Sequence, residues 1–196
     1  MHLTLSSTCS PIVGEAERTA RQVIGDLGTR WRHTIGVATR AAAIAAPLGV
    51  DRDLLVAAAW LHDIGYGTTA VGIGFHPLDG ADYLAARGWP PDVTCLVAHH
   101  SGARFIAAAR GLSERLAAYP EPGGPLADAL TYADQTVGPG GDWVSARERY
   151  AEMLRRHGPE SDNAKVDPER RLYLETLTGR VERRLMGACL TGIAAG

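Results

Sequence analysis

Lysine is almost absent from this sequence: of 196 residues, one is lysine, two are phenylalanine and three are cysteine. Lysine and arginine together number 20, against 22 aspartates and glutamates, which gives a formal charge of -2. The chain therefore lacks the bulk positive charge that binding to a phosphate backbone requires. We expect no nucleic-acid partner.

Long apolar runs are also missing. The longest, Ala41 to Val50, is interrupted by Pro47 and is far shorter than the roughly 20 residues that span a bilayer. The N-terminus lacks a basic region before an apolar run. The three cysteines (Cys9, Cys95 and Cys189) are widely spaced and form no CxxC pair, which suits reduced thiols. These features predict a cytoplasmic protein with no membrane partner.

Alanine, leucine and arginine, separated by short glycine and proline breaks, predict an all-α fold in a single domain over residues 1–196. Asp51 is the expected N-cap of the most apolar helix, and Ser145 with Glu148 matches a capping box. Asp167 is the expected N-cap of the last helix, and Pro47 is expected to stop the second. The predicted helices cover residues 14–27, 30–46, 52–64, 77–86, 91–100, 104–110, 113–118, 126–136, 145–156 and 168–190.

Histidines are concentrated in the middle of the chain, where five of the seven lie between His33 and His100. His62 and Asp63 end the most apolar predicted helix, where polar groups are costly unless they are paired or bind metal. Packed helices can bring dispersed imidazoles and carboxylates to one level of a bundle. Such ligands suit iron, manganese, zinc, cobalt or nickel rather than calcium. The candidate ligands are His33, His62, Asp63, His76, His99, His100 and Asp134.

Three segments resemble, in order, the motifs of the HD-domain metal-dependent phosphohydrolases, whose fold is a helical bundle. They are RHTIGVA at 32–38, AWLHDIG at 59–65 and LTYAD at 130–134. Two further segments, FHPLDGA at 75–81 and VAHH at 97–100, resemble the additional histidines of the HDIG-type, two-metal branch. The resemblance covers a core of about residues 30–136 and leaves the helices at about 144–190 as a C-terminal extension.

The resemblance implies a centre with two divalent metal ions. His33, His62, Asp63 and Asp134 would hold the first ion, and Asp63 could bridge to the second. His76 with one or both of His99 and His100 would bind that second ion. Because neighbouring side chains on a helix point ~100° apart, one of these two histidines is expected to be the ligand, and the other to contact the substrate or a ligand. Catalysis would centre on His62 and Asp63. Iron or manganese is expected, with zinc, cobalt, nickel or magnesium as alternatives.

The implied activity is the hydrolysis of a phosphoester or phosphoanhydride in a small, nucleotide-like substrate. Two alternatives stay open. The same ligands could hold a di-iron pair that activates oxygen, as in HD-type oxygenases, or they could serve a regulatory module that binds metal without catalysis. The sequence predicts no oligomeric state.

One departure from the family concerns phosphate recognition. Many members have a lysine directly after HDIG, whereas this chain has Tyr66 there and its only lysine is Lys165. Phosphate recognition must then depend on arginines or on backbone amides. Arg30 lies three residues before His33 and so faces the same side of a helix, and Arg104 flanks another ligand segment. Arg30, Arg104 and Tyr66, which could donate a proton or hydrogen bond, are the candidate substrate contacts.

Overall fold

The computed structural model describes residues 10–194, with side chains described for residues 10–190, and all regular structure in that range is helical. This confirms the all-α prediction. The helices are α1 (Pro11–Ile24), α2 (Thr29–Leu48), α3 (Arg52–Leu61), η1 (Ile64–Tyr66), α4 (His76–Ala85), α5 (Pro91–His99), η2 (His100–Gly102), α6 (Ala103–Ala109), α7 (Ser113–Leu116), α8 (Gly124–Gln135), α9 (Ala146–His157), α10 (Asp162–Lys165) and α11 (Glu169–Ala194).

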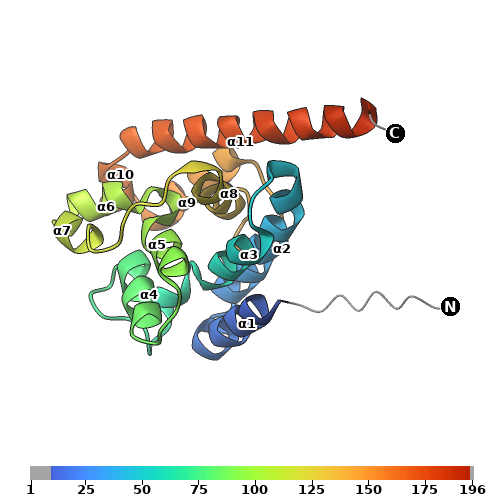
Figure 1. Cartoon of the computed structure of the whole chain (residues 1–196). Coiled ribbons are helices and arrows are strands. Elements are labelled where there is room, and N and C mark those ends of the chain that lie inside the picture. Colours follow the sequence, from blue (N-terminus) through green and yellow to red (C-terminus); the bar gives the residue numbers. More distant parts are fainter. Residues whose placement is uncertain (1–9, 195–196) are drawn as a thin grey trace.

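Helix α3 lies among α1, α2, α5 and α8 (Figure 1). Its central residues, from Leu55 to Ala59, are buried, as expected for a helix that is apolar on nearly every side. The carboxylate of Asp51 accepts a hydrogen bond from the backbone N–H of Leu54 at 2.9 Å, which confirms the predicted N-cap. The helix ends at Leu61, three residues earlier than predicted, because the chain turns into η1. His62 and Asp63 therefore lie in a turn at the buried end of α3.

Helix α2 runs beyond the predicted stop. Pro47 lies inside its last turn, and the helix ends at Leu48. A proline near a helix end costs one backbone hydrogen bond without ending the helix, and Gly49 closes it with a left-handed φ of 64°. That conformation suits glycine at a helix C-terminus. The two extra residues include Leu48, which is buried in the core.

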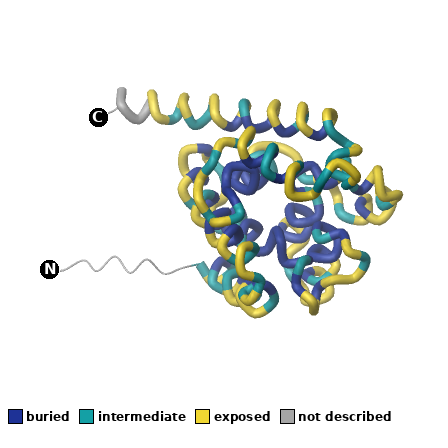
Figure 2. The backbone as a smooth tube through the Cα atoms, turned by 180° about the vertical axis from the view of Figure 1, so that it is seen from behind, coloured by how far each residue is buried: buried dark blue, intermediate teal, exposed yellow. Residues whose placement is uncertain are grey.

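The C-terminal helices cover one side of the core. Figure 2 shows buried positions of α11 facing the body, and they include Leu174, Leu177 and Val181. The capping box of α9 is present, with Ser145 and Glu148 in the predicted roles. The short helix α10 was not predicted, since four residues are too few to show a helical period.

The start of α11 differs from the prediction. Asp167 does not cap the helix: its carboxylate accepts hydrogen bonds from the hydroxyl of Tyr150 at 3.0 Å and from Arg171 at 3.1 Å. The helix begins at Glu169. Asp167 therefore ties the start of α11 to α9 rather than closing its first turn.

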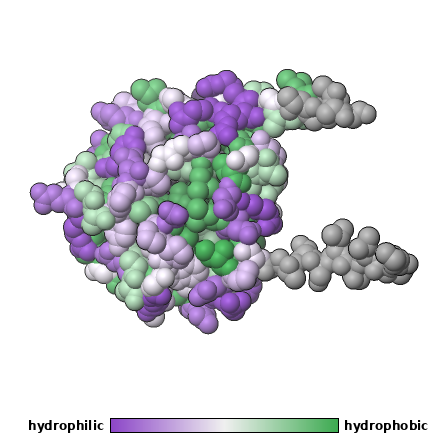
Figure 3. Space-filling view, in the orientation of Figure 1, coloured by the Kyte–Doolittle hydropathy of each residue, from purple (hydrophilic) through white to green (hydrophobic). Residues whose placement is uncertain are grey.

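The surface is mixed in polarity. On the face seen in Figure 3, hydrophobic residues gather in a strip near the centre, with hydrophilic residues around it. Among the residues that the structure describes, no helix combines the length and the apolar character needed to cross a membrane. Cys95 and Cys189 are free, in line with the expectation of reduced thiols, and Cys9 lies outside the described residues.

Candidate metal centre

Three side chains from separate helices meet in the core and are called here the inner group: His33 on α2, His62 directly after α3 and Asp134 on α8. All are buried, with exposed fractions of 1%, 0% and 6%. Nε2 of His33 lies 2.9 Å from Oδ1 of Asp134, and one ligand atom of each residue lies within 4.8 Å of the others. Ligand atoms on one transition-metal ion are roughly 3–4 Å apart. The inner group could therefore hold an ion.

Asp63, His76 and His100 form a second cluster, called here the outer group, whose ligand atoms also lie within 4.8 Å of one another. Nε2 of His76 is 3.4 Å from Oδ1 of Asp63 and 3.3 Å from Nε2 of His100. Nδ1 of His100 is 2.6 Å from the carbonyl oxygen of Val97. Asp63 and His100 are buried, whereas the side chain of His76 is 25% exposed. The outer group could hold a second ion.

Asp63 lies between the two groups. Its Oδ2 is 3.2 Å from Nε2 of His62 in the inner group, and its Oδ1 is 3.4 Å from Nε2 of His76 in the outer group. A carboxylate with one oxygen on each side can contact two neighbouring cations. This placement matches the bridging role that the resemblance implies for Asp63.

Backbone carbonyls orient the imidazoles. Nδ1 of His33 is 3.2 Å from the carbonyl of Gly138, and Nδ1 of His62 is 2.7 Å from that of Ala59. A carbonyl only accepts, so Nδ1 of each ring donates to the carbonyl, and Nε2 of each ring is the atom that faces the carboxylates. His100 is held in the same way. Such carbonyl contacts are typical of histidines that bind metal through Nε2.

One buried nitrogen atom supports the binding of a cation at the inner group. Nε2 of His62 is fully buried and has no hydrogen-bond partner among the described residues, although Oδ2 of Asp63 is 3.2 Å away. A buried polar atom without a partner is costly. A metal ion bound to Nε2 would remove that cost, so the donor set fits the group that the sequence implies.

The charges of Asp63 and of the inner group also favour a bound cation. Burial acts to raise the pKa of the Asp63 carboxyl, but the charges of Arg30 and His62 outweigh it and hold that pKa well below its usual range. Burial also acts to raise the pKa of Asp134, and its contact with His33 holds the pKa well below the usual range. For His62, burial acts to lower the pKa, and the carboxylate of Asp63 raises it. Two ionised carboxylates in the core thus favour a positive charge between them.

The pKa values of the two imidazoles in the outer group shift in the opposite direction to that of His62. Burial lowers the pKa of His76 well below its usual value, and the neighbouring His100 lowers it further. Burial likewise lowers the pKa of His100, with a contribution from His62. Both rings are therefore neutral at pH 7, which is the form that binds a metal ion.

Arg30 and Tyr66 stand beside the outer group, in line with their predicted positions. Nη1 of Arg30 is 2.5 Å from Oδ2 of Asp63, and its guanidinium lies 4.1 Å from the centre of the Tyr66 ring. Tyr66 in turn stacks on the ring of His76 with centroids 4.2 Å apart. Burial and the Asp63 carboxylate raise the pKa of Tyr66 to about 12, so its phenol stays protonated.

Two predicted site residues lie elsewhere. His99 points away from both groups, and its Nε2 donates to the carbonyl of Tyr119 at 2.7 Å. Arg104 lies on the surface, where it pairs with Glu121 at 2.5 Å and does not line the cavity described below. His99 points away from the groups because of a kink in the backbone: α5 ends at His99, and His100 has extended backbone angles. The kink turns His100 inward and leaves His99 outside.

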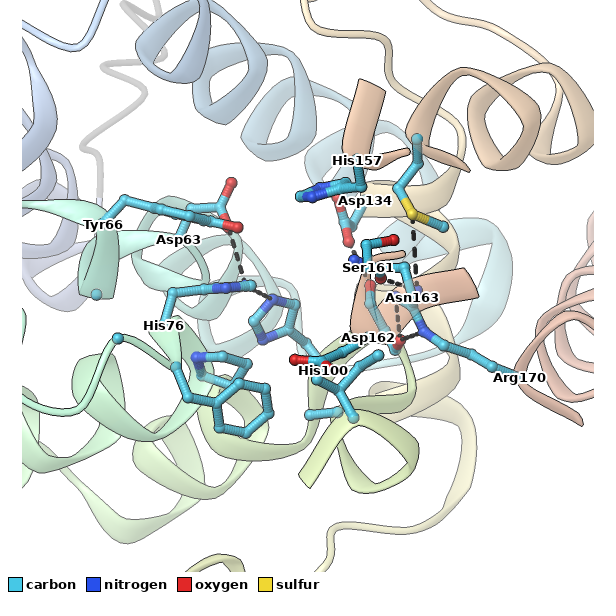
Figure 4. Close-up of a pocket in the computed structure, with 18 of the residues that line it drawn as sticks. Asp63, Tyr66, His76, His100, Asp134, His157, Ser161, Asp162, Asn163 and Arg170 are labelled. Carbon is cyan, nitrogen blue, oxygen red and sulfur yellow. Dashed lines mark hydrogen bonds and ion pairs between the residues drawn. The ribbon is translucent and has the colours of Figure 1, made fainter. Parts of the chain in front are cut away.

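The outer group and Asp134 of the inner group line a cavity of about 480 Å³. In Figure 4, Tyr66, Asp63 and His76 lie on one side, and His157, Ser161 and Asn163 face them from the C-terminal elements. Five arginines and four carboxylates are among its described lining residues. The C-terminal elements thus form a wall of the cavity opposite Asp63 and His76.

Several cavity residues were missed by the sequence analysis. Arg149, Arg156 and His157 come from α9, beyond the predicted motif core. One signal was available: Arg149 and Arg156 lie three and four residues from Glu152, so the three share a helix face. Nothing in the local pattern, however, says that this face meets the cavity.

A positioning network around Asp134 was also missed. Its Oδ2 accepts from the hydroxyl of Ser101 and from Nε2 of Gln135 at 3.0 Å. Ser101 has a positive φ of 53°, and its carbonyl accepts from the buried Arg170 of α11 at 2.9 and 3.1 Å. The C-terminal extension therefore holds the turn that orients Asp134.

Comparison with known proteins gives one family. The family model of the HD domain matches residues 30–137, which includes every member of both groups. No curated protein and no solved structure matches the chain. The matched segment is more than half of the sequence and contains the buried histidine and aspartate side chains in the expected order. The chain therefore belongs to the HD-domain family.

Proposed function

We propose that this protein is a metal-dependent phosphohydrolase that cleaves a phosphoester or phosphoanhydride of a small, nucleotide-like substrate. The observation that carries the proposal is the position of the inner and outer groups against a cavity lined by arginines. Buried His/Asp clusters supply ligands for divalent ions, and guanidinium groups suit phosphate oxygens. The combination favours a phosphorylated substrate over a neutral one.

The inner group would hold one ion, the outer group another, and Asp63 would contact both. Two bound divalent ions, iron or manganese being the expected ones, supply Lewis acidity toward a phosphoryl group and lower the pKa of a water molecule. The protein's own part is to keep the ligand atoms in place. Carbonyl contacts to Nδ1 do this for His33, His62 and His100.

Arg30 and Tyr66 have separate roles in the proposal. Arg30 holds Oδ2 of Asp63 and keeps the rest of its planar guanidinium at the cavity wall. Tyr66 packs between Arg30 and His76, and its protonated phenol can donate a hydrogen bond to a substrate oxygen. Together they take the place of the lysine that follows HDIG in many family members.

The size and charge of the cavity support a small anionic substrate. A volume of about 480 Å³ lies within the range of small-molecule sites. Five arginines and four carboxylates nearly cancel in charge, so two divalent ions would make the cavity strongly positive. An anion would then be attracted to it.

The test is a panel of phosphomonoesters, phosphodiesters and nucleotides, assayed under strict anaerobiosis with Mn²⁺ in ¹⁸O-labelled water. We expect cleavage of at least one class, with ¹⁸O in the released phosphate, and no cleavage by the His62→Ala variant. Hydrolysis needs no change of oxidation state, so it proceeds without O₂.

Two results would contradict the proposal. Substrate-dependent O₂ uptake by iron-loaded protein, with no hydrolysis in the panel, would identify an oxygenase. Saturation with metal together with neither hydrolysis nor O₂ uptake would indicate a regulatory module.

A further inference from the structure

A small side pocket of about 50 Å³ opens between α2 and α9, next to the main cavity. Its described lining residues are Thr29, Arg30, His33, Pro139, Arg149 and Arg156. Three of these are arginines, and none of the described lining residues is a carboxylate. Since one water needs about 10–15 Å³, the pocket has room for a few water molecules or one phosphoryl group. Its lining suits an anion.

The positive charge of the arginines in this pocket is only partly neutralised by carboxylates, as Arg149 shows. Its side chain is only 7% exposed, and its Nε has no hydrogen-bond partner among the described residues. Its Nη1 pairs with Oε2 of Glu152 at 2.7 Å, and the other oxygen of that carboxylate accepts from Nε of Arg156 at 2.9 Å. One carboxylate thus orients two guanidinium groups and cannot neutralise both. The remaining positive charge faces the pocket.

The start of α2 adds to this field. Thr29 is the first residue of the 20-residue helix α2, whose first turn contains no acidic side chain. The N-terminal end of a helix carries partial positive charge that attracts anions, and this holds for α2 although the N–H of Arg30 donates to the carbonyl of Leu27. The side pocket therefore combines arginines from two helices with a helix N-terminus.

The side pocket adjoins both the candidate metal centre and the main cavity. His33, a member of the inner group, forms part of the wall of the side pocket. The three arginines of the side pocket also line the main cavity. An anion bound there would lie beside a group held at the candidate metal centre. Arg149 and Arg156 belong to α9, beyond residue 137, where the family match ends.

We propose that Arg149 and Arg156, held by Glu152, form a subsite for a second phosphoryl group of the substrate, separate from the phosphoryl group at the candidate metal centre. This rests on the proposed function and narrows its substrate class to compounds with two phosphoryl groups. A phosphoryl dianion matches several guanidinium groups better than a single-charged group does. The C-terminal extension would then determine substrate specificity.

The experiment counts phosphate ions by equilibrium dialysis with ³²P-labelled inorganic phosphate, using metal-free and Mn²⁺-loaded full-length protein. The variants are Arg149→Gln and Arg156→Gln, and the matched control is Arg155→Gln, an exposed neighbour on α9 that does not line either pocket. Arg156 is exposed, so its variant should fold even if loss of the buried Arg149 destabilises the protein. Thermal unfolding of each variant checks this.

For metal-free protein we expect about one phosphate per chain, bound at least tenfold more weakly by both variants and within about twofold of wild type by the control. The Mn²⁺-loaded wild type should bind about two phosphates, and Arg156→Gln about one. Equal binding by wild type and Arg156→Gln, or a single phosphate on the loaded wild type, would overturn the subsite. Phosphate binding to metal-free protein needs no catalysis, so a failure of hydrolysis in the substrate panel would be a separate result.

Discussion

The inner and outer groups use the same residue types, but the outer group contains one imidazole, His76, that is held differently from the others. In the inner group, both imidazoles are 1% exposed or less, and each bonds a backbone carbonyl. In the outer group, the side chain of His76 is 25% exposed and stacks on Tyr66. The difference indicates that the inner group is part of the core, whereas the outer group is open to the cavity. We expect the inner ion to bind more tightly and to exchange more slowly.

Asp63→Asn should have the largest effect because Asp63 faces both groups. An amide keeps the shape but loses the charge that two cations need, so the variant should lose metal from both groups. Hydrolysis should fall at least about 10³-fold, which corresponds to ~4 kcal/mol of lost stabilisation. The measurements are metal content by mass spectrometry and kcat/KM.

The matched control is Asp53→Asn, which removes a carboxylate in the first turn of α3 whose side chain is 47% exposed. It should keep both metal content and rate. Unchanged metal content in Asp63→Asn would contradict the role of Asp63 between the groups.

The two groups can be separated by replacing one histidine in each. His76→Ala should lose one ion per chain and keep the inner one, because the inner group contains no atom of His76. His62→Ala should lose the inner ion, and also weaken the outer one, since Asp63 then loses its contact with Nε2 of His62. Metal content after dialysis distinguishes the two. Equal losses in both variants would show that the groups act as one site.

Arg30→Gln should have a smaller effect, because Arg30 contacts Asp63 without being a candidate ligand. The variant should keep its metal, while kcat/KM falls by about tenfold or more. A charge-assisted hydrogen bond contributes ~1.5–3 kcal/mol, which is the scale of that loss. Wild-type kinetics in this variant would assign phosphate recognition to the arginines of α9.

Ser145→Ala should have the smallest effect and leave both groups intact. Oγ of Ser145 accepts from the backbone N–H of Glu148 at 3.2 Å, and removal of such a cap costs about 1 kcal/mol of stability. Ser145→Thr keeps the cap and serves as the control. Urea unfolding gives the free energies, and a change in metal content would show that α9 and the metal groups are coupled more strongly than the fold suggests.

Much of the fold could be predicted from local pattern. The apolar run of α3 with its Asp51 cap, and the Ser145–Glu148 box of α9, were correct because their signals lie within a few residues. The end of α3 was placed too late, since the turn at His62 depends on packing around it. Motif order also predicted which helices carry the inner group.

The candidate site was only partly predictable. On a continuous helix, neighbouring side chains point about 100° apart, so His99 and His100 could not be told apart. The kink at His100 decides between them, and Arg170, 69 residues away, donates to the carbonyl of Ser101 beside this kink. The position of Arg149 likewise depends on the path of the chain after α8. Long-range contacts of this kind leave no local signal.

The number of metal ions per chain tests the central claim most directly. The protein, prepared anaerobically and saturated with Fe²⁺ or Mn²⁺, is analysed by mass spectrometry after removal of excess metal. Two ion-binding groups that share Asp63 predict about two ions per chain, one released before the other by a chelator. Saturation at one ion per chain, or no retained metal, would contradict the account.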